Sequence, residues 1–343
     1  MMMSGPEELN KWPIAITETN YAGDGASRLV WCELTQPDIK YSDFEQNLRR
    51  LMQRDDKPLT DPETKQHVSV RVLNPDAKGG LGVVVSPLTR PQHLQLCALL
   101  AAARPNAPLA VVEPPGFGHT DPLQTAGHMH LGYTGRFART GRILVEALLA
   151  QGEGYLPTEY FADSRYSRYA IGMACVEGTP PVSRLAINNP PTVPLRTLLK
   201  GYITDERTAS KQRAASADPY AKPPEWLSEG LTVPRGRLAT LRQLGARGIG
   251  QAFDDLRALG TYSDVSKPGT PPLQRDLELA LERHPNLYVS VISPDGPNAA
   301  RLAGIMSVLR FPEKRFVSRL GVPNATSSFG RHHPSVLVSA LLH

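Results

Sequence analysis

Residues 109–122 read LAVVEPPGFGHTDP, a short apolar run that passes directly into a loop with two glycines. Short apolar runs flanked by Gly and Pro are typical of strands that are buried on both faces of a sheet. A phosphate-binding loop at residues 116–118 is a poor alternative, because no third glycine and no Lys-Ser or Lys-Thr pair follow at the required spacing. The stretch therefore predicts a central strand at 109–112 followed by a tight loop.

Strands and helices alternate on both sides of this stretch. Short strands that alternate with longer helices indicate βαβ units and an α/β fold, in which a mostly parallel sheet carries helices on both faces. The predicted strands are 13–19, 28–34, 67–72, 81–85, 109–112, 159–162, 184–188, 286–292 and 315–320. The predicted helices are 41–55, 92–103, 137–150, 168–176, 237–244, 249–259, 299–309 and 334–342.

The composition favours one large core with an insertion over two equal domains. The chain has 343 residues, of which 41% are hydrophobic, so a sizeable core can form. Its net charge of +5 is small for this length, and we expect no nucleic acid partner. The 3 cysteines, Cys32, Cys97 and Cys175, show no metal-like spacing, which argues against a disulfide framework and favours a reducing compartment.

Membrane and export signals are also missing from the pattern. The first residues lack a basic start followed by an apolar run, so we expect no signal peptide. No run of about 18 apolar residues occurs, so we expect no membrane span. The predicted location is therefore cytoplasmic.

The loop after the strand at 109–112 resembles one of the α/β-hydrolase superfamily. That family often carries Asp-x-Pro-Gly-x-Gly-x-Ser-Asp after its fourth strand. In this chain Glu113 stands for the Asp and is followed by Pro115, Gly116, Gly118, Thr120 and Asp121. The resemblance implies an α/β-hydrolase fold, and it covers residues 79–189 and 286–342.

A second motif resembles the nucleophile elbow of the same family. Residues 159–170 read EYFADSRYSRYA, a strand that enters a tight turn and opens a helix. Ser164 aligns with the central serine of Gly-x-Ser-x-Gly, whereas Ala162 and Tyr166 stand where the family has glycines. Small residues there let the strand and helix approach closely, so Ala162 is tolerable and Tyr166 is the largest departure from the pattern.

The resemblance implies bearers for the remaining catalytic roles. Asp295 just follows a predicted strand, where the family places its acid, and His332 or His333 precedes the last helix, where the family has its His loop. We favour His332, which stands two residues after Gly330. The oxyanion hole would use the backbone N–H of Arg165 and that of Leu88, because Pro87 has no N–H to donate.

Each of these residues also has an ordinary structural interpretation. Ser164 could be a helix N-cap, Asp295 a turn residue in Pro-Asp-Gly, and the two histidines exposed loop residues. Asp163 ranks below Ser164 as a nucleophile, because its alignment would place the strand end awkwardly. The histidines after the glycine loop lack the further ligands that a metal needs, so we expect no metal site and no cofactor; they are His119, His128 and His130.

The chain is predicted to have four sections. Residues 1–78 form an N-terminal section with leading strands, 79–194 and 286–343 form the core, and 195–285 form a helical insertion that resembles the cap of the family. Three functions remain open: a serine hydrolase acting on a small-molecule acyl substrate, an inactive member of the fold that binds a ligand or a protein, and a structural component. A protein partner would use the N-terminal section or the basic cap.

Overall fold

The computed structural model of the protein describes residues 11–19, 27–35, 37–53, 59–60, 67–88, 91–114, 120, 157–163, 166–176, 180–190, 216, 218–230, 272–294, 317–322, 330 and 333–343. Four predicted helices lie outside these residues, those at 137–150, 237–244, 249–259 and 299–309. Of the predicted helical insertion, only residues 216, 218–230 and 272–285 are described.

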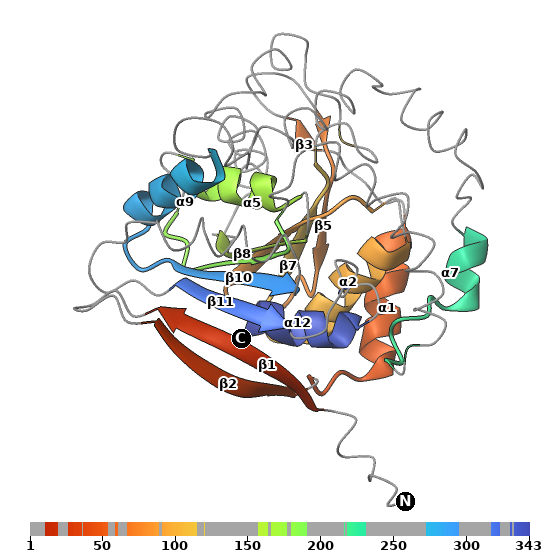
Figure 1. Cartoon of the computed structure of the whole chain (residues 1–343). Helices are drawn as coiled ribbons and strands as arrows, with labels where there is room; N and C mark the ends of the chain where they lie inside the picture. Colours follow the sequence, from red (N-terminus) through yellow and green to blue (C-terminus); the bar gives the residue numbers. More distant parts are fainter. Residues whose placement is uncertain are drawn as a thin grey trace, which may run out of the picture.

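A nine-stranded sheet runs through the described part of the chain (Figure 1). In spatial order its strands are β2 (Ser27–Thr35), β1 (Lys11–Thr19), β11 (Val317–Val322), β10 (Tyr288–Pro294), β9 (Arg184–Asn188), β8 (Pro157–Asp163), β6 (Leu81–Val85), β7 (Leu109–Val112) and β5 (Val70–Leu73). The pairs from β11 to β7 are parallel, whereas β1, β2 and β5 pair antiparallel. The mostly parallel sheet predicted from the sequence is confirmed.

Helices cover both faces of this sheet (Figure 1). They are α1 (Tyr41–Met52), α2 (Pro91–Ala102), α5 (Ser167–Ala174), α7 (Glu225–Gly230), α9 (Pro272–Arg283) and α12 (Pro334–Leu342). One apolar cluster joins the sheet to α5 and α9, and a second joins it to α1, α2 and α12. Helices on both faces complete the α/β architecture that the sequence predicts.

The central strands place alternate residues in the two clusters. In β6, Val83 and Val85 belong to the cluster with α5, whereas Val84 belongs to the cluster with α2. In β8, Tyr160 and Phe161 divide in the same way. A fully buried side chain of this kind contributes about 1.5–3 kcal/mol, so a slip of one residue would disturb both clusters at once.

The N-terminal hairpin closes one edge of the sheet. Strands β1 and β2 pair along their whole length, as the predicted leading strands suggest, and β1 then pairs with β11 near the other end of the chain. Figure 1 shows this hairpin beyond β11, at the far edge from β5. The sequence predicts the two strands but carries no signal for the edge that they join.

The strand predicted at 67–72 is divided in two. Strand β4 (His67–Val68) pairs with β3 (Leu59–Thr60) in a separate small sheet, and β5 begins at Val70. Ser69 lies between them, because its carbonyl accepts the N–H of Glu113 and its N–H donates to Thr120 Oγ1. The Ser69 carbonyl continues the pairing of β5 with β7, whereas the Ser69 N–H is taken by the side chain of Thr120.

Two described pieces of the predicted insertion pack on the core helices. Helix α9 packs against α5, and its Leu273, Leu277 and Leu281 are buried. Leu227 in α7 is buried in the other cluster, beside α1 and α2. Among the described residues, no helix is both long and apolar enough to cross a membrane.

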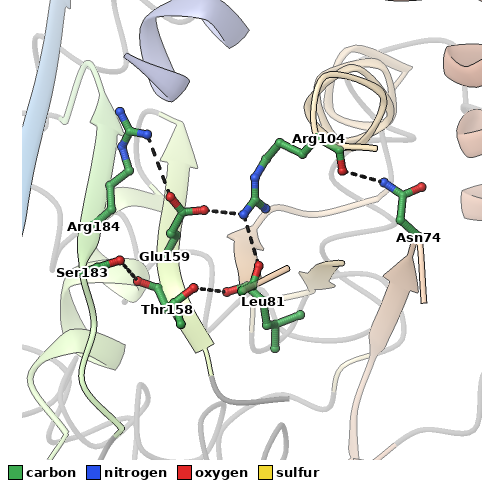
Figure 2. Close-up of polar contacts among 8 residues, drawn as sticks. Asn74, Leu81, Arg104, Thr158, Glu159, Ser183 and Arg184 are labelled. Carbon is green, nitrogen blue, oxygen red and sulfur yellow. Dashed lines mark hydrogen bonds and ion pairs between the residues drawn. The ribbon is translucent and has the colours of Figure 1, made fainter. Parts of the chain in front are cut away.

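A charged network lies at the amino ends of the parallel strands. Figure 2 shows Glu159 between Arg104 and Arg184: one carboxylate oxygen bonds Arg104, and the other lies 3.9 Å from Arg184 Nη1. The side chain of Arg104 is 9% exposed, and Gly82 of β6 gives it room because a Cβ there would clash with the guanidinium. Glu159 is the carboxylate that balances these two arginines.

We expect Glu159→Ala to destabilise the protein by about 3 kcal/mol, because breaking a buried pair leaves an uncompensated charge. The free energy of unfolding in urea measures the loss. Glu45→Ala is a matched control, because Glu45 bonds Arg49 on the exposed face of α1 and its loss should cost only about 0.5 kcal/mol. Equal losses in the two variants would show that the network does not stabilise the amino ends of the strands.

Candidate active site

The order of the strands reverses between β6 and β8. From β6 the chain passes through α2 to β7 on one side, and it later returns to the other side, where β8, β9, β10 and β11 follow in turn. In open parallel sheets, ligands bind outside the carboxyl ends of the strands at such a switch point. The segments that leave β6 and β8 at this point begin at Ser86 and at Ser164.

The elbow predicted around Ser164 has a strand before it and a helix after it. Strand β8 ends at Asp163, and α5 begins at Ser167 with Tyr166 at its N-cap. Ser164 and Arg165 lie outside the described residues. The strand before them and the helix after them are the flanks that a nucleophile elbow requires.

Tyr166 is accommodated by packing into the core. Its side chain is 2% exposed, and its ring meets that of His93 edge to face, with 5.6 Å between centroids. His93 lies in the first turn of α2, and its Nδ1 is 3.1 Å from the carbonyl oxygen of Pro87, which can only accept. The tyrosine where the family has glycine is thus held against the helix that follows β6.

Asn188 bonds the last residue of β8 and lies near Gly330. It ends β9, is 4% exposed, and donates from Nδ2 to Asp163 Oδ1 at 2.6 Å. A side-chain carbon added at Gly330 would lie 3.5 Å from this Nδ2 and would clash with Leu337. A larger residue at 330 would therefore require the end of the Leu337 side chain to move, and Gly330 lies near the end of β9.

The predicted oxyanion donor Leu88 has a partner within the protein. Its N–H donates to Glu113 Oε1 at 2.9 Å, and Glu113 is 1% exposed. Thr120 Oγ1 in turn donates to the carbonyl oxygen of Glu113 at 2.9 Å. Glu113, which stands for the aspartate of the family pattern, therefore fastens the loop after β6 to the loop after β7.

The remaining predicted residues are divided between described and undescribed parts of the chain. Asp295 and His332 lie outside the described residues, and so do the histidines considered as metal ligands, which are His119, His128 and His130. His333 is half-buried directly before α12, and burial lowers its pKa, whereas the carboxylate of Asp218 opposes that shift. In the described part of the chain, no group of three His, Cys, Asp or Glu side chains is arranged to hold a metal ion.

Sequence reasoning did not find three residues at this edge, His93, Asn188 and Asp218. Each is buried and polar, and each bonds a residue of another element. No motif contains them, and their separations along the chain from the residues that they bond differ widely. A polar residue at the end of an apolar strand, such as Asn188, is the one local signal that the sequence offered.

Comparison with known proteins supports the fold alone. No protein-family model matches the chain, and neither does any curated protein. Among solved structures it is similar to a membrane phospholipase A described as a bacterial virulence factor, with a TM-score of 0.54 at 14% identity over 88% of this chain and 89% of that one. It is also similar to the carboxylesterase CesB (YbfK) from Bacillus subtilis, with a TM-score of 0.50 at 11% identity over 88% and 95% of the two chains.

A third structure, that of a variant of aCif, has a TM-score of 0.54 at 12% identity and covers 90% of this chain and 97% of its own. These neighbours are α/β-hydrolases, and the similarity to them covers most of this chain. The protein therefore has the α/β-hydrolase fold. The fold predicted from its two motifs is confirmed.

Cys97 is not expected to act as a nucleophile at this site. Burial raises its pKa to about 12, with Ser86 lowering it and the charges of Glu113 and Asp163 raising it further. Because the thiolate is the reactive form, maleimide at about pH 8 should leave Cys97 unmodified in the folded protein and modify it in urea. Peptide mass mapping measures both states, and modification of Cys97 before unfolding would contradict the expectation.

Proposed function

We propose that the protein is a serine hydrolase that cleaves an ester, thioester, amide or lactone through an acyl-enzyme. The observation that supports the proposal is the position of the elements that flank Ser164: β8 ends at Asp163 at the switch point of an α/β-hydrolase sheet, and α5 begins at Ser167. Function in this fold depends on the site, so the neighbours' names give no substrate for this chain.

In the proposed mechanism Ser164 is the nucleophile. His332 or His333 takes the proton from Ser164 Oγ as that oxygen attacks the acyl carbon, and Asp295 orients and stabilises the imidazolium. The histidine then gives the proton to the leaving group, and a water that it deprotonates releases the acid and restores the serine. The N–H groups of Arg165 and Leu88 would bind the oxyanion, and one such donor is worth about 3 kcal/mol in the barrier.

The low pKa of His333 agrees with a base. Burial lowers this pKa below its ordinary value, so the imidazole is neutral near pH 7 and can accept a proton. The lowered pKa also affects stability. Because burial favours the neutral ring of His333, its contribution to the stability of the fold is complete above the ordinary pKa of histidine. That contribution is lost as the pH falls through the lowered pKa of His333.

We expect a fluorophosphonate to add once to the wild-type protein and not at all to Ser164→Ala. An activated serine attacks the phosphorus and displaces fluoride, whereas an alanine has no oxygen to attack. Intact mass before and after treatment detects the adduct, and circular dichroism checks that both proteins are folded. A folded wild type that stays unlabelled, beside a serine hydrolase that is labelled in the same reaction, would exclude the proposal.

A second candidate is an inactive α/β-hydrolase-fold protein that binds a ligand or a protein partner. The contact that favours it is the bond from Leu88 N–H to Glu113, because an N–H that already donates to a buried carboxylate has less to offer an oxyanion. Buried Tyr166 in place of the elbow glycine also favours it. An unlabelled, folded wild type whose melting temperature rises with added acyl compounds would support this candidate.

A further inference from the structure

Asp218 belongs to the insertion between β9 and β10, yet it bonds the first turn of the last helix. Its Oδ2 accepts the N–H of Ser335 at 3.0 Å and the hydroxyl of the same residue at 2.6 Å. Its Oδ1 accepts the N–H of Tyr220 at 2.9 Å. The carboxylate is 5% exposed and Ser335 is 1% exposed, so water competes little for these bonds.

The segment that carries Asp218 is itself fixed to the core. Tyr220 donates its hydroxyl to the carbonyl oxygen of Ile39 at 2.8 Å, and its own carbonyl accepts Gln95 Nε2 at 3.0 Å. Its ring lies against those of Tyr41 and Phe44 in α1. Asp218 is therefore held on two sides, by α1 and α2 through Tyr220 and by α12 through Ser335.

His333 stands two residues before Ser335, at the start of the same helix. Burial lowers its pKa, and the negative charge of Asp218 raises it, so the two groups interact electrostatically. The other charged or titratable residues on the elements packed against α12 are His93 and Cys97 on α2, Arg28, Cys32 and Glu33 on β2, Arg184 on β9 and Tyr288 on β10. Arg184 and Tyr288 lie at the amino ends of their strands, away from the end where Gly330 meets Asn188.

The geometry points to Asp218 as a positioning residue for His333, which caps the start of α12, and as the counter-charge of His333. The inference rests on the proposed function for its catalytic consequence: a base that takes the proton of Ser164 becomes a cation, and a buried carboxylate held by three hydrogen bonds stabilises that cation. In this arrangement the predicted insertion orders the base, since Asp218, which anchors the start of α12 beside His333, comes from it.

A purely structural cap would act differently from a counter-charge, and two variants separate them. Asp218→Asn removes the charge and keeps an oxygen acceptor, whereas Ser335→Ala removes one bond to Asp218 and keeps the charge. We expect Asp218→Asn to lower the pKa of His333, and Ser335→Ala to leave it close to the wild-type value. Proton–carbon NMR of the histidine rings measures this pKa, with the signal assigned by His333→Gln.

The catalytic consequence is measured as the rate of fluorophosphonate labelling at a series of pH values. The midpoint of the labelling rate should fall in Asp218→Asn together with the pKa of His333, and the rate near pH 7 should drop on the order of tenfold. Asp295→Asn in the same assay measures the other proposed carboxylate. A pKa and a midpoint that stay unchanged in Asp218→Asn, with only the melting temperature lowered, would overturn the inference and leave Asp218 a helix cap.

Labelling of the wild type tests the proposed function, whereas the pKa of His333 in Asp218→Asn tests the role of Asp218. If the wild type is not labelled but the pKa of His333 still falls in Asp218→Asn, the serine hydrolase is excluded and the electrostatic link stands. If Asp218→Asn does not fold, Tyr220→Phe tests the same anchor, because it removes the bond to Ile39 and keeps the carboxylate. Slower labelling of folded Tyr220→Phe would support the positioning role, and an unchanged rate would overturn it.

Discussion

Strand β6 pairs with β7 on one side and with β8 on the other, and the rest of the structure depends on this pairing. The chain leaves β6 for one side of the sheet and later continues on the other, so the crossover helices lie on both faces. The same reversal brings the ends of β6 and β8 side by side, where the two segments with candidate chemistry begin. Burial of both faces of β6 fixes its register, because a slip would exchange the residues facing the two clusters.

Polar contacts between buried side chains and loops give the carboxyl edge its shape. Glu113 holds the N–H of Leu88, His93 holds the carbonyl of Pro87, and Asn188 holds the carboxylate of Asp163. Each contact joins two different segments of the chain. Buried polar groups that are paired in this way favour a single arrangement of the loops. The amino edge instead carries an ion-pair network around Glu159, which joins the starts of β6, β8 and β9 (Figure 2).

The described part of the predicted insertion is connected to α1, α2 and α12 through a small set of buried groups. Tyr220 bonds Ile39 and Gln95, and Asp218 bonds Ser335 at the start of α12. A chain segment that begins after β9 thus contacts elements from both ends of the sequence. Because these bonds are shielded from water, loss of one partner leaves the other buried and unpaired, which makes the contact specific as well as stabilising.

The sequence by itself determined the central elements residue for residue: the strands Leu81–Val85, Leu109–Val112 and Arg184–Asn188 and the helix Pro334–Leu342 match the predicted ranges. Their apolar runs and flanking Gly and Pro are local signals, and so are the two motifs that predicted the fold. Tertiary structure alone decided the edge that β1 and β2 join, the break at Ser69, the partner of Leu88 and the contact of Asp218 with α12. Each of these depends on a contact between residues far apart along the chain, and local periodicity carries no information about such partners.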